Sequence, residues 1–265
     1  MLRFSANLSL LFTEYPLQER FAAAKAHGFE AVEIQFPYQL AASQLKDLLD
    51  EQDLQLVLFN VDADNLLQGG EGLAAVPELR SRFREAVLQA RDYAQVLRPR
   101  AINVLPGRCL EPGRLGSYRQ TLLENLRYAA DCFADIGIIT VFEAVNSYDM
   151  PCFILDSSTA MLEVLDTLAH PCLRLQYDIY HMYRMGEDCG VFLNEHLEKV
   201  GHIQFADCPG RGQPGTGQIN FDALFSMISA SNYEGWLGAE YRPQGETVRS
   251  LAWLDQFTRL QGSET

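Results

Sequence analysis

The sequence predicts one α/β domain spanning residues 1–265, folded as a (β/α)8 TIM barrel. Strand-like runs alternate eight times with helix-like segments, at about 33 residues per unit. A length of 265 residues and a hydrophobic content of 48% provide material for one large core. No GxGxxG motif follows the first predicted strand, so the pattern favours a closed barrel over an open dinucleotide-binding sheet.

The first half of the chain contains four strand–helix units. Short apolar or alternating runs predict the strands, and amphipathic segments between them predict the helices. The expected strands are 3–9, 31–35, 54–60 and 101–107, and the expected helices are 17–28, 43–52, 78–97 and 116–136. Ser43 is expected to cap the second helix. The glycine-rich segment 61–77 is long enough to be either a lid over the strand ends or a surface excursion.

The second half contains four further units with a distinctive pattern. Its apolar runs are IITVFEAVN (138–146), LRLQYDIYH (173–181), HIQFADCPG (202–210) and WLGAEYRP (236–243). Helices are expected at 157–169, 191–199, 221–231 and 244–260, with Ser157 and Asp222 at two of the helix starts.

Each of these four runs bears an oxygen-bearing side chain at or near its C-terminal end, namely Glu143, Asp178, Gln204 and Glu240. Strand ends meet at one mouth of a (β/α)8 barrel, so we expect the four to converge on one site. Any one of them alone could equally be a helix cap or half of an ion pair. Burying three carboxylates together is costly unless a cation compensates them. A hard, all-oxygen set favours a divalent metal ion, Mg²⁺ or Mn²⁺ rather than Zn²⁺.

Such a site suits a substrate with a carbonyl beside a hydroxyl group. The metal would polarise the carbonyl, acidify the adjacent C–H and stabilise an ene-diolate. Glu143 and Glu240 end the first and last of the four runs and are the expected catalytic acid and base. A metal-assisted hydride shift is an alternative route, because a carboxylate bound to a cation is a weakened base.

Other polar residues near the predicted strand ends are candidates for binding substrate. Histidines and asparagines in this group could instead support a ligand or satisfy the barrel interior, and the arginines could simply be exposed. Arginine is suited to holding a substrate carboxylate. The candidates are His181, expected in a loop over the site, together with His202, Asn7, Asn103, Arg108, Arg211 and Arg242.

The composition restricts the partners. With 35 acidic against 21 basic residues and a net charge of −14, the chain lacks the basic character of nucleic-acid-binding surfaces. The six cysteines show no CxxC pair, which favours reduced thiols in the cytoplasm. We see neither a convincing signal peptide nor a membrane-spanning segment, and expect a soluble cytoplasmic protein that does not bind membranes. A homo-oligomer is compatible with this composition.

Five stretches make the sequence resemble the hydroxypyruvate isomerase family of xylose-isomerase-like barrels: FSANLSLLFTE (4–14), FEAVNSYDMPCFIL (142–155), QYDIYHMYRMGED (176–188), HIQFADCPGRGQPGTGQINF (202–221) and YEGWLGAEYRP (233–243). The resemblance implies a (β/α)8 fold and aldehyde–ketone isomerisation of a small hydroxy-oxo acid, interconverting hydroxypyruvate and tartronate semialdehyde (2-hydroxy-3-oxopropanoate). It also implies proton transfer by Glu143 and Glu240, with Asp178 and Gln204 completing the metal site. The sequence departs from it at Arg242, where we expect lysine.

Three other functions compete with this one. Within the isomerases, the substrate could be a longer oxo acid such as 2-oxo-tetronate, or a neutral ketose. A metal-dependent abasic-site endonuclease is a remote alternative, opposed by the acidic charge and by the small number of histidines, five in all. A non-catalytic binding barrel would not need the complete four-residue ligand set.

Overall fold

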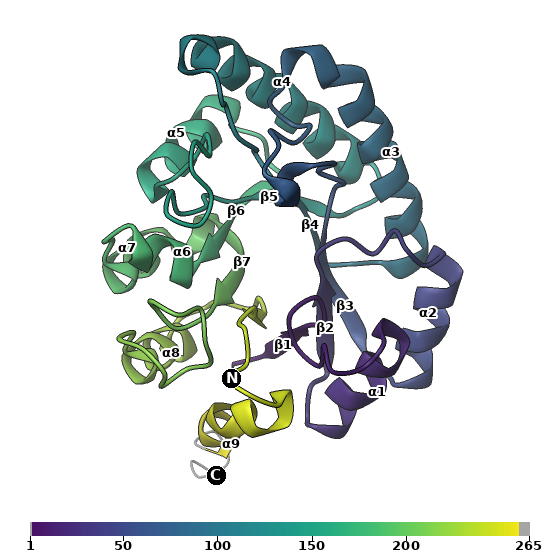
Figure 1. Ribbon diagram of the computed structural model, residues 1–265, viewed down its shortest axis with the longest axis vertical. Coiled ribbons are helices and arrows are strands. Elements are labelled where there is room, and N and C mark those ends of the chain that lie inside the picture. The colour runs from purple at the N-terminus through teal and green to yellow at the C-terminus, as the bar shows by residue number, and fades with distance from the viewer. Residues whose placement is uncertain (1, 260–265) are drawn as a thin grey trace.

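The structure, a computed structural model, describes residues 2–259, in which eight parallel strands close into a barrel in sequence order, as expected (Figure 1). The last strand pairs with the first, which closes the barrel. The strands are β1 (Phe4–Asn7), β2 (Ala31–Ile34), β3 (Gln55–Asn60), β4 (Ala101–Val104), β5 (Ile139–Phe142), β6 (Leu173–Asp178), β7 (Val200–Phe205) and β8 (Leu237–Ala239).

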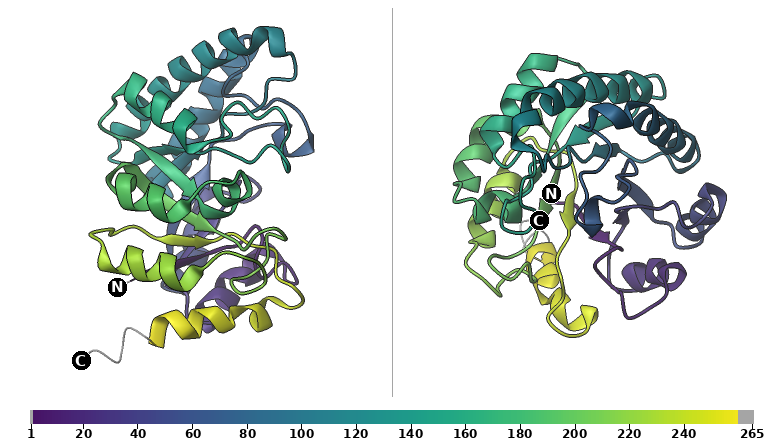
Figure 2. Two further views of the ribbon diagram at one scale, coloured as in Figure 1. Left: turned by 90° about the vertical axis from the view of Figure 1, so that its left-hand side faces the viewer. Right: turned by 45° about the horizontal axis from the view of Figure 1, so that its top comes forward.

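The helices form a ring outside the strands, which Figure 2 shows from two further directions. They are α1 (Leu17–Ala26), α2 (Ala42–Glu51), α3 (Arg80–Leu97), α4 (Leu115–Ala134), α5 (Ser158–Leu168), α6 (Ile179–Arg184), α7 (Cys189–His196), α8 (Phe221–Ala230) and α9 (Ala252–Arg259). No helix among the described residues is both long and apolar enough to cross a membrane.

Of the three residues expected to cap helices, two do not. Ser157 does cap α5, accepting a hydrogen bond from the backbone N–H of Ala160. Helix α2 begins one residue before Ser43, and the side chain of Gln44 accepts from the backbone N–H of Ala41. Helix α8 is capped by Asn220 rather than Asp222. Where several polar residues adjoin a helix start, the sequence alone does not show which one has the capping geometry.

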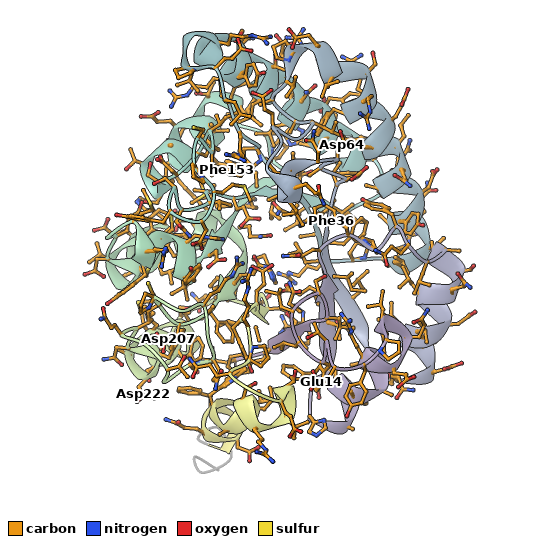
Figure 3. All side chains as sticks on the ribbon, in the orientation of Figure 1. Glu14, Phe36, Asp64, Phe153, Asp207 and Asp222 are labelled. Atoms are coloured by element: carbon orange, nitrogen blue, oxygen red, sulfur yellow. The ribbon has the colours of Figure 1, made fainter. Side chains whose placement is uncertain are left out.

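The hydrophobic core lies between the barrel and the helix ring. One well-defined part is an aromatic cluster at the β8–β1 closure, in which Trp253 of α9 packs edge-on against Phe4 and Phe205, with ring centroids 5.2 and 5.1 Å away. Glu14, labelled in Figure 3, accepts hydrogen bonds from the backbone N–H and hydroxyl of Thr247, joining the loop after β1 to the segment before α9. These contacts attach the C-terminal helix across the closing strand pair.

The inside of the barrel is polar toward the C-terminal ends of the strands. Glu33, Asn103, Gln176, His202 and Gln204 are all at least 98% buried, although they carry charged or amide groups. Side chains two apart on a strand share a face, which is why Gln176 lies on the same inward face as Asp178, and His202 on that of Gln204. These interior side chains form the layer on which the candidate site is built.

Candidate active site

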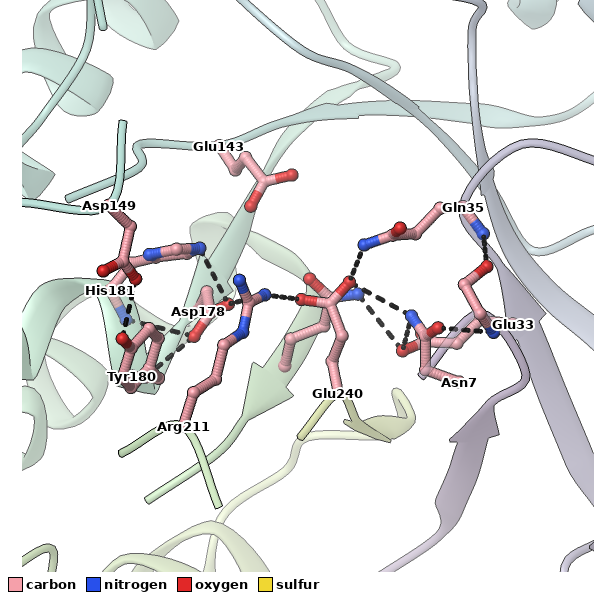
Figure 4. A network of polar contacts seen from close by, with 12 residues as sticks. Asn7, Glu33, Gln35, Glu143, Asp149, Asp178, Tyr180, His181, Arg211 and Glu240 are labelled. Atoms are coloured by element: carbon pink, nitrogen blue, oxygen red, sulfur yellow. Dashed lines mark hydrogen bonds and ion pairs between the residues drawn. The ribbon is translucent and has the colours of Figure 1, made fainter. Parts of the chain in front are cut away.

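The predicted ligands lie at the C-terminal mouth of the barrel. Asp178 is the last residue of β6 and Gln204 lies within β7, whereas Glu143 and Glu240 come directly after β5 and β8. All four side chains belong to residues that are at least 95% buried. In Figure 4, Glu143, Asp178 and Glu240 are gathered around the guanidinium of Arg211.

Arg211 lies among the acidic residues at the mouth. Ligand atoms of Glu143, Asp178 and His181 lie within 4.8 Å of one another. Glu240 is not part of this group; its carboxylate accepts a hydrogen bond from the guanidinium of Arg211, whose Nη2 is also 4.0 Å from Oδ2 of Asp178. Arg211 therefore supplies positive charge between carboxylates that the sequence assigned to a metal ion.

The carboxyl groups are strongly perturbed by their surroundings. Burial, together with the charges of Glu240 and Asp178, raises the pKa of Glu143 well above its usual range. Burial likewise raises the pKa of Glu240 to about 7, against the opposing effect of Arg211. The pKa of Asp178 is raised by burial too. One arginine does not fully compensate these three buried acids.

The donor set at this mouth suits a divalent cation. Carboxylate oxygens of Glu143 and Asp178 lie close together, and carboxylate oxygens are the usual ligands of Mg²⁺ and Mn²⁺. Among the described residues, the buried amide oxygens of Asn103 and Gln176 have no hydrogen-bond partner, although each residue donates to Glu143. Added positive charge would relieve the repulsion that raises the carboxyl pKa values.

Gln204 is held by its neighbours on both sides of its amide. Its Oε1 accepts a hydrogen bond from Nε2 of Gln176 at 2.7 Å, and its Nε2 donates to Oε1 of Glu33 at 3.1 Å. To act as a ligand, the amide oxygen would exchange or share its bond from Gln176. We had not singled out Gln176 or Glu33 as site residues, although both lie on inward faces of their strands.

His181 lies in helix α6 and not in a loop, which corrects the expectation from sequence. Asp178 is at once the last residue of β6 and the N-cap of α6, because its Oδ1 accepts from the backbone N–H groups of Tyr180 and His181. Asp178 before the segment 179–184 and Gly186 after it, with φ of 83°, are typical helix-boundary residues, so the sequence did contain a signal for this helix. This cap leaves Oδ2 of Asp178 facing Nε2 of His181 at 3.5 Å.

The hydrogen bonds around His181 define its tautomer. Two hydrogen bonds with Asp149 fix the side chain of Asn146. The backbone N–H of Asp149 donates to Oδ1 of Asn146, and Nδ2 of Asn146 donates to the carboxylate of Asp149. Nδ2 and the backbone N–H of Asn146 both face Nδ1 of His181, so we assign Nδ1 as the acceptor and the proton to Nε2. Burial, with Arg211 and Arg184 nearby, lowers the pKa of His181 well below its usual range. The neutral ring therefore presents an N–H donor to the site.

Three of the predicted substrate contacts lie against acidic side chains. Asn7 donates to Oε1 of Glu240 at 3.1 Å, and Asn103 donates to Oε1 of Glu143 at 2.7 Å. His202 contacts Oε2 of Glu33 at 2.7 Å and does not line the cavity at the mouth. These residues hold carboxylates in place rather than face the open side of the site.

The three predicted arginines occupy very different positions. Arg108 donates to the carbonyl oxygens of Gly69 and Pro151, each at 2.7 Å, and so connects two loops. Arg242 is exposed and does not line the cavity. Arg211 is the one of the three that lines it, and its buried Nε has no hydrogen-bond partner among the described residues.

The loop that carries Arg211 is built around Asp207, labelled in Figure 3. The carboxylate of Asp207 accepts hydrogen bonds from the backbone N–H groups of Cys208, Gly215, Gly217 and Ile219. Arg211 itself has a left-handed backbone, with φ of 53°, which is uncommon for a residue with a side chain. This loop geometry directs the guanidinium toward the barrel mouth.

A small cavity of about 80 Å³ lies at the mouth. Its polar side includes Gln35, Glu143, Gln176, His181, Arg211 and Glu240, and its apolar side includes Phe36, Leu67, Leu105, Val145 and Met150. Leu67 belongs to the segment 61–77, for which the sequence allowed either a lid or a surface excursion. The cavity is far smaller than the roughly 300–1,000 Å³ of typical drug-sized ligand sites, which favours a substrate of a few carbon atoms.

A closed (β/α)8 barrel with buried acids, amides and one arginine around a small cavity at its C-terminal mouth is typical of a barrel enzyme. Residues 21–257 match the family model described as xylose isomerase-like TIM barrel, and the chain belongs to this family. The resemblance seen in the sequence is thereby confirmed.

Two curated relatives align with nearly the whole chain. Hydroxypyruvate isomerase of Escherichia coli K12 is 41% identical over 257 residues, covering 97% of this chain and 100% of its own. A 2-oxo-tetronate isomerase of Cupriavidus necator is 36% identical, covering 97% and 99%. Since both are named as isomerases, the expectation that this chain is an isomerase is confirmed at that level.

A solved structure titled AP endonuclease, family 2, from Brucella melitensis superposes with a TM-score of 0.93 at 34% sequence identity. The alignment covers 97% of this chain and 99% of that one.

Proposed function

We propose that this protein interconverts hydroxypyruvate and tartronate semialdehyde by proton transfer through an ene-diolate. The observation that carries the proposal is the pair of buried glutamates, Glu143 and Glu240, with raised pKa values on one small cavity that Arg211 also lines. The names of the two full-length relatives support an oxo-acid substrate.

Glu143 and Glu240 are proposed as the acid–base pair. Without a bound cation, burial raises the pKa of Glu240 to about 7, so its carboxyl group can give or take a proton near neutral pH; a bound cation would lower that pKa and make Glu240 a weaker base. Burial protects both groups from bulk water, and hydrogen bonds from Asn103 and Asn7 fix their orientation. One glutamate would remove a proton from the hydroxyl-bearing carbon, and the other would deliver one to the neighbouring carbon, while the hydroxyl proton passes from the first oxygen to the carbonyl oxygen.

Arg211 is proposed to hold the substrate carboxylate. Its Nη2 is engaged by Glu240, whereas its Nε has no partner among the described residues and is available for a charge-assisted hydrogen bond. The N–H at Nε2 of His181 lies near the same acids and could donate to a substrate oxygen. In a chain with a net charge of −14, an anionic substrate needs such close positive contacts.

We propose Mg²⁺ or Mn²⁺ as the cofactor, held by Glu143 and Asp178, with Glu240 and Gln204 completing the ligand set. When bound, the ion would supply positive charge that polarises the carbonyl of the substrate and stabilises negative charge on the ene-diolate. For Glu240 to join, its carboxylate would have to exchange or share its contact with Arg211.

A substrate panel tests the proposal. Hydroxypyruvate, 2-oxo-tetronate and a neutral ketose are each supplied to the purified protein, with and without Mg²⁺ or Mn²⁺. We expect the highest kcat/KM for hydroxypyruvate, because the cavity is small and Arg211 favours a carboxylate. Faster turnover of the neutral ketose would contradict the substrate assignment.

The 2-oxo-tetronate reaction is the second candidate, supported by the relative from Cupriavidus necator. The panel separates it from the first by the ratio of the two kcat/KM values. We propose that the partners include a small hydroxy-oxo acid and exclude nucleic acid. Although one similar structure is titled an AP endonuclease, the net charge of −14 of this chain opposes binding to a phosphate backbone.

A further inference from the structure

We propose that Glu33 is the positioning residue of this site: its carboxylate, inside the barrel below the mouth, orients the side chains that hold both Glu143 and Glu240. The inference rests on the proposed function, since it assigns a role to Glu33 in the same reaction. Glu33 does not line the cavity and is therefore not proposed to touch substrate.

The carboxylate of Glu33 is completely buried and surrounded by donors. Its Oε2 contacts Nε2 of His202 at 2.7 Å, and its Oε1 accepts from Nε2 of Gln204 at 3.1 Å and from Nδ2 of Asn7 at 3.3 Å. An ionised carboxylate can only accept hydrogen bonds. Each neighbouring amide must therefore turn its nitrogen toward Glu33.

One branch from Glu33 leads to Glu240. Nδ2 of Asn7 donates to Glu33 and also to Oε1 of Glu240, at 3.1 Å (Figure 4). Oδ1 of Asn7 accepts from the backbone N–H of Ser9, so both ends of this amide are fixed. Reversing the amide would place its oxygen against two carboxylates.

The other branch leads to Glu143. Because Gln204 turns its nitrogen toward Glu33, its oxygen points to the opposite side, where it accepts from Nε2 of Gln176. Nε2 of Gln176 donates in addition to Oε1 of Glu143, at 3.0 Å. Glu33 thus defines which end of the Gln204 amide faces the proposed ligands, and an amide binds a cation only through its oxygen.

Strand β8 leaves room for this carboxylate. A Cβ atom added to Gly238 would lie 2.3 Å from Oε1 and 2.7 Å from the carboxyl carbon of Glu33. Any side chain at position 238 would displace the carboxylate or the strand. The glycine therefore allows Glu33 to lie directly against the backbone of β8, within reach of donors from β1 and β7.

Glu33→Gln tests the inference while keeping the size of the side chain. A glutamine at position 33 could turn its NH₂ group toward Asn7 and Gln204, which would reverse the orientation of both side-chain amides. If it turns its oxygen toward them instead, their orientation is kept but the negative charge is lost. Loss of a residue that orients ligands typically lowers metal affinity or activity by about 10–100-fold. We expect Glu33→Gln to lower the affinity for Mn²⁺ by this factor, measured by titration calorimetry without substrate. We expect kcat to fall by a similar factor, whereas KM for hydroxypyruvate should change by less than about threefold.

Ser5→Ala is the matched control. Ser5 is buried on β1, two residues before Asn7, and its hydroxyl has no hydrogen-bond partner among the described residues. The substitution perturbs the barrel interior without touching Glu33, so Mn²⁺ affinity and kcat should remain near those of the unmodified protein. Gly238→Ala is a second variant, whose added Cβ must displace the Glu33 carboxylate or strand β8, and it should weaken Mn²⁺ binding as Glu33→Gln does.

The outcomes separate this inference from the proposed function. If the unmodified protein isomerises hydroxypyruvate and folded Glu33→Gln matches it in Mn²⁺ affinity and kcat, Glu33 merely fills the barrel and the inference is overturned. If Glu33→Gln does not fold, unchanged Mn²⁺ binding by Gly238→Ala overturns it instead. If the unmodified protein binds Mn²⁺ but does not act on hydroxypyruvate, and folded Glu33→Gln binds Mn²⁺ more weakly, the inference stands and the proposed function fails.

Discussion

Replacing Arg211 by methionine should destabilise the metal-free protein in a pH-dependent way. The guanidinium contacts the carboxylate of Glu240 and lies 4.0 Å from that of Asp178, and its side chain is only 19% exposed. Although burial opposes it, the charges of these two acids raise the pKa of Arg211. Methionine retains much of the apolar volume but leaves the buried acids without their positive partner.

The expected size of the effect follows from this burial. Removing one member of a buried ion pair costs about 3–5 kcal/mol. At roughly 2 °C per kcal/mol for a chain of this size, the melting temperature should fall by about 6–10 °C at pH 8. At pH 6 the loss should be smaller, because Glu240, whose pKa is raised to about 7, is then mostly protonated and no longer a full ion-pair partner.

Thermal unfolding followed by circular dichroism at pH 6 and pH 8 measures this difference. Arg242→Met is the matched control, because Arg242 is exposed and is joined to Arg211 only through its backbone N–H. In kinetic assays, Arg211→Met should raise KM for hydroxypyruvate much more than KM for an uncharged hydroxy-ketone. Equal melting temperatures for the two variants at pH 8 would refute the assigned role of Arg211.

Three further predictions concern the glutamates, the metal and the loop over the site. Glu143→Gln and Glu240→Gln should each lower kcat by about 10²–10⁴-fold or more without loss of helical circular dichroism, and a folded variant with near-normal turnover would argue against that glutamate. Folding raises the pKa of Glu240 to about 7, so the protonated carboxyl group stabilises the metal-free protein at lower pH. This contribution is lost as pH rises through about 7. Added Mn²⁺ should therefore raise the melting temperature more at pH 8 than at pH 6, where protons compete for the ligands, and an equal rise would count against carboxylate ligands. Arg108→Met should increase proteolytic cleavage within residues 61–77 severalfold, because the bond to Gly69 is lost; unchanged cleavage would show that other contacts hold this loop.

The fold and the acidic residues of the site could be predicted because both depend on local patterns. Short apolar runs alternating with amphipathic segments define the barrel, and the C-terminal ends of its strands meet at one mouth, which brings polar residues at those ends near one another. Glu143, Asp178 and Glu240 were found in this way. Their common location follows from topology and requires no detail of the loops.

The remaining contacts depend on tertiary geometry that a local pattern does not contain. Arg108, Arg211 and Arg242 all follow strands, but the loop built around Asp207 brings Arg211 into the cavity. Glu33 lies within the predicted strand 31–35, yet its role depends on partners 169 and 171 residues away in the chain. Long-range hydrogen bonds of this kind become visible only when the barrel is closed.

The central claim, isomerisation of hydroxypyruvate by proton transfer, is tested most directly by following the reaction in D₂O with Mg²⁺ by NMR. We predict that tartronate semialdehyde appears with deuterium on the carbon that received the proton, and that Glu143→Gln and Glu240→Gln abolish the signal. No conversion of hydroxypyruvate under conditions where a neutral ketose is converted would contradict the substrate. Conversion with complete retention of the original hydrogen would contradict transfer through glutamates that exchange with solvent, and would point to a hydride shift or to a proton shielded from water.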